Sequence, residues 1–575
     1  MGAAWFLLFA VALASGAVGA LSAAAEGWSE SWFGSGDGWL FWLTWREDPG
    51  GRRLVLALAA AATWWIFASA AVRIQGLARI GRAARFLAER LGRPAPALAA
   101  AALALLPHLV VPLAGPNAAG RPSVVVVLLD SVRLDHVGWG GAKRPTTPRL
   151  DELAARGLVF RQAIAPAPWT KPAVASLLTG LTPGHHLAIG KPDQLGFAVL
   201  PPDRRTLAEA LAREGWFTAA VSGNPNIAAR FGFDQGFLRF FHDSSRRAPE
   251  LIEIARRFLA EAGDRPFFLY LHLNDAHYPY EAPAPWRGRF AAGSAPPRLD
   301  GTSLNAFRLG RLDWDAKEAA ALAAAYDEEI LALDEQVGSF LEELLATEPN
   351  LIAVVLADHG EEFLDHGDLG HGHTLNDELL RVPLQLAWSG EPGLAAGEVA
   401  AQVGTLDLMP TLLELCGLRW PERARPLDGR SLLPVLRGEA EERPVFAETE
   451  SPGSPRSGLT GPLRCWRRPE AKLIQTDPWR QKAGRIWLYD LAADPGETRN
   501  LAGARPELRR RLAAELAGSG FLQPLPRPAG PAPLLDPTVL AELAEMGYVD
   551  APEALVEPVE PTFAAGAVPW WEEPD

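Results

Sequence analysis

The stretch Ser123-Val124-Val125-Val126-Val127-Leu128-Leu129-Asp130 decides the fold of the larger part of this chain of 575 residues. An uncharged run this rich in valine is typical of a strand buried on both faces of a sheet. Similar runs recur at Phe217–Ser222, Phe267–Leu273 and Leu351–Ala357, and helical patterns lie between them at Leu207–Glu214, Leu251–Ala262 and Ala316–Leu345. Strands that alternate with helices predict an α/β domain with a mostly parallel sheet and helices on both faces.

Polar residues follow each of these predicted strands. Asp130 follows the first, Asn224 the second, His277 the third, and Asp358-His359 the fourth. Ligands of open α/β sheets bind in the crevice at the carboxyl ends of the strands. An aspartate beside a histidine at a strand end offers a metal ion one oxygen and one nitrogen, although such an aspartate also caps turns. With Asp130 at a neighbouring strand end, the pattern favours a metal site.

The N-terminal residues 1–116 are predicted to form a membrane domain. Three stretches, at about 5–25, 54–74 and 95–115, are apolar and almost free of charge. A length of about 20 residues matches a hydrocarbon core of about 30 Å. A cleaved signal peptide remains the alternative for the first stretch, and buried soluble helices for the other two.

Arginines predict the orientation of this domain. The segment Arg73–Pro94 carries six arginines against one acid, at Arg73, Arg79, Arg82, Arg85, Arg90, Arg93 and Glu89. The segment Glu26–Arg53 is net acidic. Because basic loops stay in the cytoplasm, everything after about Asn117 is predicted to be extracytoplasmic. We therefore expect a multi-pass protein of the cell inner membrane with its catalytic domain outside.

Three further units are predicted along the chain. They are a catalytic domain at 123–440, a small C-terminal α+β subdomain at 441–520, and a tail at 521–575. The tail is rich in proline and acid and is expected to be extended apart from a short helix at Val539–Met546.

A net charge of −14 argues against nucleic acid as a partner. The two cysteines, Cys416 and Cys465, can form one disulfide, but Cys416 lies in an apolar helical run and reads more simply as a buried small residue.

Several motifs in the right order resemble the sulfatase family of the alkaline phosphatase superfamily. They are Leu128-Leu129-Asp130, Thr147-Pro148-Arg149-Leu150-Asp151, Pro168-Trp169-Thr170-Lys171-Pro172 with Leu177-Leu178-Thr179-Gly180, Asp275-Ala276-His277, Asp358-His359-Gly360-Glu361, Arg381-Val382-Pro383, Asp407-Leu408-Met409-Pro410-Thr411 and Leu488-Tyr489-Asp490-Leu491. The resemblance implies the alkaline-phosphatase fold and a metal held by acids after the first strand and by an Asp-Asn or Asp-His pair after a later one.

The chain departs from the sulfatase pattern where that pattern serves sulfate chemistry. Thr170 stands in place of the Cys or Ser that becomes formylglycine, Ser131 in place of the second acid, and Val174 in place of an arginine. The Lys-x-His element that cradles sulfate is missing at Gly223-Asn224-Pro225-Asn226. A threonine cannot form the aldehyde, so it would attack directly through its hydroxyl.

What remains is similar to a membrane-anchored branch of the superfamily with a threonine nucleophile, the lipoteichoic acid synthases and phosphoethanolamine transferases. The resemblance assigns the metal to Asp130, Thr170, Asp358 and His359, and catalysis to Thr170, His277 and His371. Substrate contacts are predicted for Lys171, Asn224 and His373. His373 competes with His371 for one role, and a solvated surface lysine is the alternative for Lys171. His272 alternates with apolar neighbours and reads as a structural histidine.

These residues predict one divalent ion, with Zn or Mn favoured and Ca possible, because the set includes an imidazole. The leading hypothesis is a membrane-anchored phosphoester hydrolase or phosphotransferase that acts on an envelope lipid headgroup or a glycan ester. The alternative is a sulfuric ester hydrolase. A third hypothesis is a non-catalytic domain that binds an anionic glycan.

Overall fold

The computed structural model describes residues 120–523, apart from 190–198, 291–295, 422–423, 440–441, 451–455, 457–460 and 477–483, together with Leu543. The three predicted spanning helices lie outside the described residues, as does the predicted helix Val539–Met546 apart from Leu543. In the part of the chain that is described, no helix combines the length and the apolar character needed to cross a membrane.

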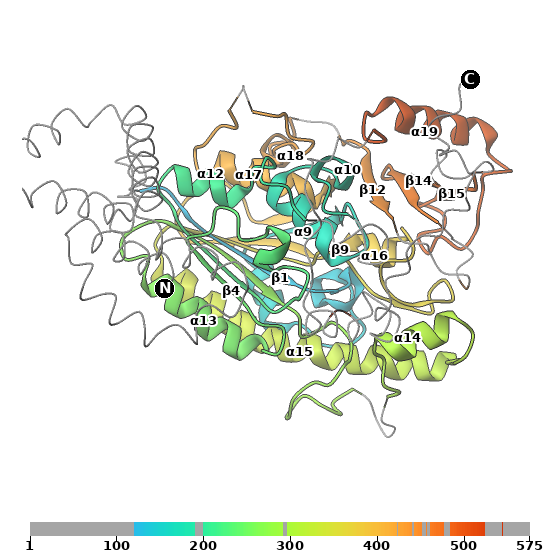
Figure 1. Ribbon diagram of the computed structural model, residues 1–575, viewed down its shortest axis with the longest axis horizontal. Coiled ribbons are helices and arrows are strands. Elements are labelled where there is room, and N and C mark those ends of the chain that lie inside the picture. Colours follow the sequence, from blue (N-terminus) through green and yellow to red (C-terminus); the bar gives the residue numbers. More distant parts are fainter. Residues whose placement is uncertain are drawn as a thin grey trace, which may run out of the picture. The chain divides into compact units, whose positions relative to one another are not determined.

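A mostly parallel sheet forms the centre of the described residues, as predicted (Figure 1). Its nine described strands include a path in the order β11 (Gly397–Gly404), β2 (Leu158–Ile164), β10 (Leu384–Trp388), β6 (Leu351–Leu356), β1 (Ser123–Leu129), β5 (Phe267–Leu273), β3 (Phe217–Ser222) and β4 (Arg239–His242), with β9 (Arg381–Val382) paired to β2. Only β9 and β10 run antiparallel to their neighbours. The four predicted strands are confirmed, the last ending one residue earlier, at Leu356.

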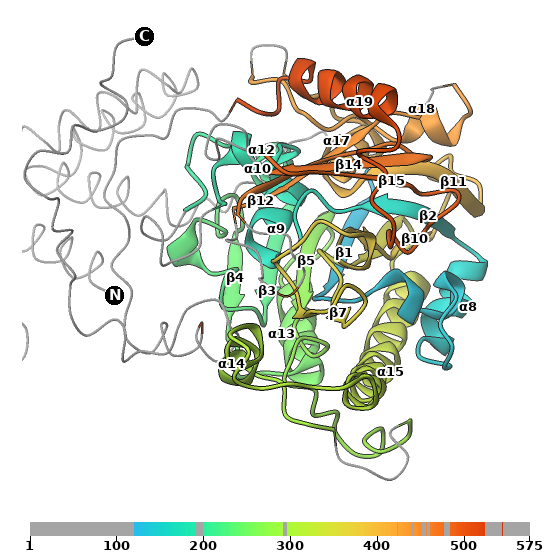
Figure 2. The ribbon, with the colours of Figure 1, turned by 90° about the vertical axis from the view of Figure 1, so that its right-hand side faces the viewer.

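Helices cover both faces of this sheet (Figures 1 and 2). One face carries α8 (Pro148–Ala155), α13 (Ala248–Ala260) and α15 (Ala316–Thr347), and the other carries α9 (Thr170–Thr179), α12 (Leu207–Arg213) and α17 (Leu408–Leu415). The predicted helices are confirmed in α12, α13 and α15. Two of them begin at a capping side chain: Thr206 accepts from Glu209 N before α12, and Asp315 accepts from Lys317 N and Glu318 N before α15.

Short elements connect these layers. They are η1 (Leu134–His136), η2 (Gly138–Gly140), η3 (Ala229–Phe231), η4 (Thr405–Asp407), α10 (Pro183–His186), α14 (Gly301–Arg308), α16 (Asp377–Leu380), α18 (Leu433–Leu436) and the hairpin strands β7 (Glu362–Phe363) and β8 (Leu369–Gly370).

A second sheet follows in the chain. It is antiparallel, in the order β12 (Val445–Thr449), β13 (Leu463–Arg467), β14 (Ala471–Thr476) and β15 (Ile486–Asp490), and α19 (Pro506–Gly518) packs against β13 and β14 (Figure 2). Cys465 on β13 and Cys416 after α17 are both buried and are not joined. The predicted domain boundaries stay predictions.

The parallel strands at the centre bring the predicted site together. β1 lies between β5 and β6, with Leu128 opposite both His272 and Leu356, and β3 lies on the far side of β5. The residues of β1 are almost wholly buried, because helices cover the sheet on both sides. Parallel neighbours end at the same edge, so the polar residues after β1, β3, β5 and β6 meet there.

Candidate active site

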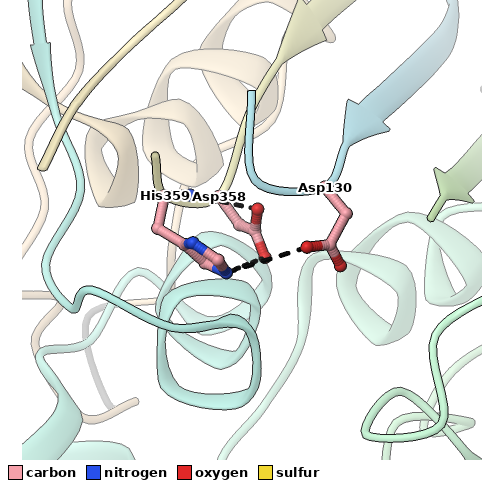
Figure 3. A group of neighbouring side chains, drawn as sticks. All are labelled: Asp130, Asp358 and His359. Carbon is pink, nitrogen blue, oxygen red and sulfur yellow. Dashed lines mark hydrogen bonds and ion pairs between the residues drawn. The ribbon is translucent and has the colours of Figure 1, made fainter. Parts of the chain in front are cut away.

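Asp130, Asp358 and His359 form one buried cluster at this edge (Figure 3). Asp130 extends from the end of β1, and Asp358 and His359 from the end of β6. Their candidate ligand atoms all lie within 4.8 Å of one another. Gly360 makes the turn after β6 possible, because a Cβ at this position would lie 1.9 Å from Glu378 O.

Thr170 completes this cluster from the opposite helix layer. It is the first residue of α9, and its Oγ1 lies 3.3 Å from His359 Nε2. A hydroxyl at the first turn of a helix sits in the positive end of the helix dipole, which stabilises negative charge on oxygen. The helix dipole therefore favours the deprotonated form of the Thr170 hydroxyl.

The geometry of the four side chains fits a divalent ion. His359 Nε2 lies 3.3 Å from Thr170 Oγ1, 3.4 Å from Asp358 Oδ2 and 3.7 Å from Asp130 Oδ1. Ligand atoms around a tetrahedral ion with bonds of about 2.0–2.2 Å lie about 3.3–3.6 Å apart. Among the described residues nothing hydrogen-bonds the buried Asp358 Oδ2. A carboxylate oxygen in that position has the lone pairs an ion would use.

The two carboxylates differ in their surroundings. Burial and the nearby charge of Asp130 raise the pKa of Asp358 well above its usual range. Burial alone would also raise the pKa of Asp130, but the hydrogen bond and charge of His272 outweigh it and hold that pKa below its usual range. A positive ion between the two groups would remove the repulsion that Asp358 experiences.

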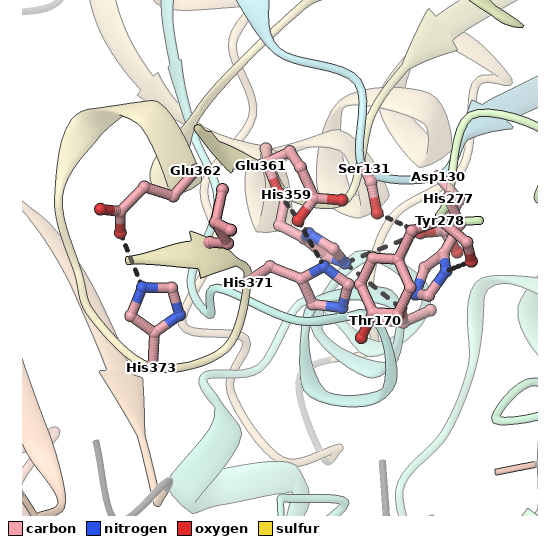
Figure 4. Close-up of polar contacts among 12 residues, drawn as sticks. Asp130, Ser131, Thr170, His277, Tyr278, His359, Glu361, Glu362, His371 and His373 are labelled. Atoms are coloured by element: carbon pink, nitrogen blue, oxygen red, sulfur yellow. Dashed lines mark hydrogen bonds and ion pairs between the residues drawn. The ribbon is translucent and has the colours of Figure 1, made fainter. Parts of the chain in front are cut away.

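Three histidines surround this cluster with Nε2 facing it and Nδ1 held by another group (Figure 4). His277 Nδ1 contacts Tyr278 O at 2.7 Å, His359 Nδ1 contacts Gly360 O at 2.8 Å, and His371 Nδ1 contacts Glu361 Oε1 at 3.0 Å. The carbonyl oxygens of Tyr278 and Gly360 can only accept, so Nδ1 of His277 and of His359 carries the ring proton and Nε2 keeps its lone pair. The rings of His277 and His359 lie 4.9 Å and 4.3 Å from that of His371.

His373 lies apart from this group. Its Nε2 contacts Glu362 Oε2 at 2.7 Å and its Nδ1 contacts Arg308 at 2.9 Å, on the side of the β7–β8 hairpin away from Thr170 (Figure 4). Of the two competing histidines, the structure brings His371 and not His373 to the cluster.

Lys171 is fully buried rather than solvated. Its Nζ lies 3.8 Å from the centre of the Phe231 ring. Burial, with the charge of Arg230, lowers the pKa of Lys171 to about 7. Lys171 is the second residue of α9, so its amino group lies against an aromatic ring inside the protein next to Thr170.

Asn224 contacts a proposed metal ligand directly. Its Nδ2 donates to Asp130 Oδ2 at 2.7 Å and to Asn274 Oδ1 at 2.8 Å. The side chain predicted to contact substrate therefore orients the carboxylate of Asp130.

Two buried residues of this region were not predicted from the sequence. His272 Nε2 contacts Asp130 Oδ2 at 2.8 Å, so its role is not only to support the strand. Glu361 receives Tyr280 OH at 3.0 Å on Oε2 and His371 on Oε1. The available signal was that a histidine within an apolar, doubly buried strand needs a polar partner.

A second group, Glu362, His366 and Glu378, also has the composition of a metal site. Its imidazole is already engaged on both sides: Nδ1 contacts Glu378 Oε1 at 2.8 Å and Nε2 contacts Gly496 O at 3.1 Å. Although burial opposes it, the hydrogen bond and charge of Glu378 raise the pKa of His366 to about 9. A doubly protonated ring has no lone pair for an ion, so this group is an ion pair.

Comparison with known proteins identifies the family. The Sulfatase family model matches residues 122–418. Human arylsulfatase A is 27% identical over 491 residues, covering 69% of this chain and 88% of its own. The multifunctional alkaline phosphatase superfamily protein PehA of Trinickia caryophylli is 28% identical, covering 57% of this chain and 79% of its own.

A solved structure gives the same fold. The phosphonate monoester hydrolase of Agrobacterium radiobacter superimposes with a TM-score of 0.58 at 23% identity, covering 69% of this chain and 95% of its own. The family match spans the strands β1, β3, β5 and β6 that carry the clustered side chains. The chain belongs to the sulfatase family of ester hydrolases.

Proposed function

We propose that this protein is a metal-dependent phosphoester hydrolase or phosphotransferase in which Thr170 is the nucleophile. The observation that carries the proposal is the 3.3 Å contact between Thr170 Oγ1 and His359 Nε2, which adds a hydroxyl to the Asp130, Asp358 and His359 cluster. A divalent ion held by these four groups would lower the pKa of the hydroxyl and balance negative charge in the transition state.

Ser131 supports phosphate rather than sulfate chemistry. Its Oγ donates to Asp130 Oδ1 at 2.8 Å and its backbone N–H donates to Asp358 Oδ1 at 3.2 Å. A donor that bridges two carboxylates thus replaces the second acid of the sulfatase pattern. With Thr170 and Val174, this substitution removes the aldehyde, one carboxylate ligand and one cation of the sulfate site.

The reaction follows from these positions. Thr170 Oγ1 bonds to phosphorus while the bond from phosphorus to the leaving alcohol breaks. The hydroxyl proton of Thr170 ends on that alcohol, relayed by His277 or His371, whose Nε2 atoms face the cluster. Water or an acceptor hydroxyl then cleaves the phosphothreonine. Lys171 would contact a non-bridging oxygen.

The choice of ion follows from the ligand atoms. Two carboxylate oxygens, a hydroxyl and an imidazole suit Zn or Mn better than Ca, which prefers six to eight oxygens. Metal analysis of the purified protein tests this choice.

The proposed substrate is an envelope lipid headgroup or glycan ester, reached from an N-terminal membrane anchor with the catalytic domain outside. The three apolar stretches and the arginine-rich segment support this topology. Reporter fusions after about residue 90 and after residue 120 test it. The first should report the cytoplasm and the second the exterior.

Hydrolysis of sulfate esters is the second candidate, favoured by the similarity to arylsulfatase A. A panel of phosphodiesters and aryl sulfates decides between the two. The proposal expects faster turnover of phosphodiesters and a phosphorylated Thr170 in the mass spectrum after brief exposure. Unmodified protein together with aryl sulfate turnover that survives Thr170→Ala would overturn it.

A further inference from the structure

The carboxylate of Asp130 receives hydrogen bonds from three side chains. Ser131 Oγ donates to Oδ1, whereas Asn224 Nδ2 and His272 Nε2 both reach Oδ2, at 2.7 Å and 2.8 Å. Oδ2 therefore has its two lone pairs occupied by nitrogen donors. Oδ1 is the atom that lies nearer the cluster, 3.7 Å from His359 Nε2.

His272 is itself held by a second residue. Its Nδ1 lies 2.9 Å from Tyr270 OH, and both side chains are buried on β5. The two can meet because alternate residues of a strand point to the same face. The phenol O–H is placed to donate to Nδ1, because a neutral imidazole carries one proton and the carboxylate oxygen Asp130 Oδ2 can only accept. His272 Nε2 must then carry the proton that goes to Asp130.

We propose that Tyr270 and His272 are positioning residues that select which oxygen of Asp130 binds the ion. The chain from Tyr270 OH through the imidazole to Oδ2 keeps that oxygen turned away, so that Oδ1, which accepts from Ser131 Oγ, faces the ion. Outer groups of this kind orient metal ligands and raise affinity without touching the metal. This inference rests on the proposed ion site.

The substitution at position 131 makes this role necessary. With Ser131 in place of a second acid, Asp130 is the only carboxylate that this loop supplies. A carboxylate free to rotate would offer the ion either oxygen and would lose the preorganised geometry. The competing idea is that His272 ligates the ion through Nε2. Ligation by His272 requires its Nδ1 to donate to Tyr270 and Oδ2 of Asp130 to lose one of its two nitrogen donors.

The test measures binding of Zn²⁺, with chelator competition, to the full-length chain and its variants. His272→Ala should weaken Zn²⁺ binding about 10–100-fold, the range for loss of an outer partner. His272→Gln should restore most of this affinity, because its amide can donate to Oδ2. The Zn²⁺ affinity of Tyr270→Phe should lie between the affinities of these two variants. His185→Gln is the matched control, since His185 pairs with Asp428 and should leave Zn²⁺ affinity unchanged.

Absorption of the Co²⁺-loaded proteins separates positioning from ligation. At saturation the bands of His272→Ala should match those of the unmodified protein, because the number of protein ligands is the same. A changed band pattern would make His272 a ligand and overturn the inference. Equal Zn²⁺ affinity in His272→Ala would also overturn it.

Two outcomes keep this inference distinct from the proposed function. If the unmodified chain binds no Zn²⁺, Mn²⁺ or Ca²⁺, the proposed function fails and the inference fails with it. If it binds Zn²⁺ and the variants bind it equally, only the inference fails. Should His272→Ala not fold, Tyr270→Phe and His272→Gln carry the test, with thermal unfolding of the ion-free proteins as the check.

Discussion

The hydroxyl oxygen of Thr170 lies 3.3 Å from Nε2 of His359, joining the first turn of α9 to the loop after β6. The nitrogen is the one that the bond from Nδ1 to Gly360 O leaves unprotonated. The proposed nucleophile and a proposed metal ligand are therefore in contact. Four measurements follow from this arrangement and its surroundings.

Thr170→Ala should lower phosphodiester turnover at least about 1,000-fold, because it removes the attacking oxygen. Thr170→Ser should keep activity within roughly tenfold, since the hydroxyl remains with a freer rotamer. The measurement is kcat/KM. Thr179→Ala is the matched control at the other end of α9, where the hydroxyl donates to Ala175 O and accepts from Leu181 N. Turnover above a tenth of normal in Thr170→Ala would contradict the assignment.

Asp358→Asn should abolish ion binding and stabilise the ion-free protein. The raised pKa of Asp358 means that its ionisation opposes folding, so the ion-free protein loses stability as pH rises above the unfolded value of about 3.9. An amide lacks that charge, and the expected gain is roughly 0.5–2 kcal/mol at neutral pH. Thermal unfolding after chelation at pH 5 and pH 7.5 measures it.

In this Asp358→Asn experiment the difference from the unmodified protein should shrink at pH 5. Added Zn²⁺ should raise the melting temperature of the unmodified protein alone. If the variant after chelation has a lower melting temperature at pH 7.5 than the unmodified protein after chelation, the repulsion between Asp358 and Asp130 is contradicted.

His371 and His373 should separate in a kinetic comparison. His371→Asn should lower kcat about 10²–10⁴-fold, because its Nε2 faces the cluster and would transfer a proton. His373→Asn should lower kcat less than about tenfold, and instead lower the melting temperature by breaking its bonds to Glu362 and Arg308. The reverse order of the two kcat values would make His373 the catalytic group.

His366 should make stability depend on pH in the alkaline range. Its pKa is raised from 6.5 to about 9, so its stabilisation is complete below about pH 6.5 and is lost as pH rises through 9. Because the ring is partly exposed, solvent screening reduces the effect to roughly 1–2 kcal/mol. Below pH 6.5 the free energy of unfolding should be higher for the unmodified protein than for His366→Gln. This difference should disappear between pH 6.5 and 9.5.

Glu378→Gln is the second variant for that measurement, since it removes the carboxylate on Nδ1. It should flatten the same pH profile, with the carboxylates of Glu362 and Glu497 left near the ring. An unchanged profile in both variants would assign the alkaline loss to another group.

The amino-acid sequence by itself determined the strands and the positions of their polar ends. The runs at β1, β3, β5 and β6 are legible because a strand buried on both faces excludes charge along its length. Asp130, Asp358 and His359 could be predicted as neighbours because parallel strands end at one edge of the sheet. The alternation of strands and helices in the sequence is enough to predict that arrangement.

Only the tertiary structure decided which polar groups meet. His371 and His373 are two residues apart, and the sequence could not separate them, because the turn of the hairpin sets where each ring points. The sequence left Lys171 open between surface and interior, and the fold buries it with its amino group against the Phe231 ring. The contacts of Asp130 with Asn224 and His272 join three strands. Hydrogen bonds over such separations depend on rotamers and packing, which no local pattern encodes.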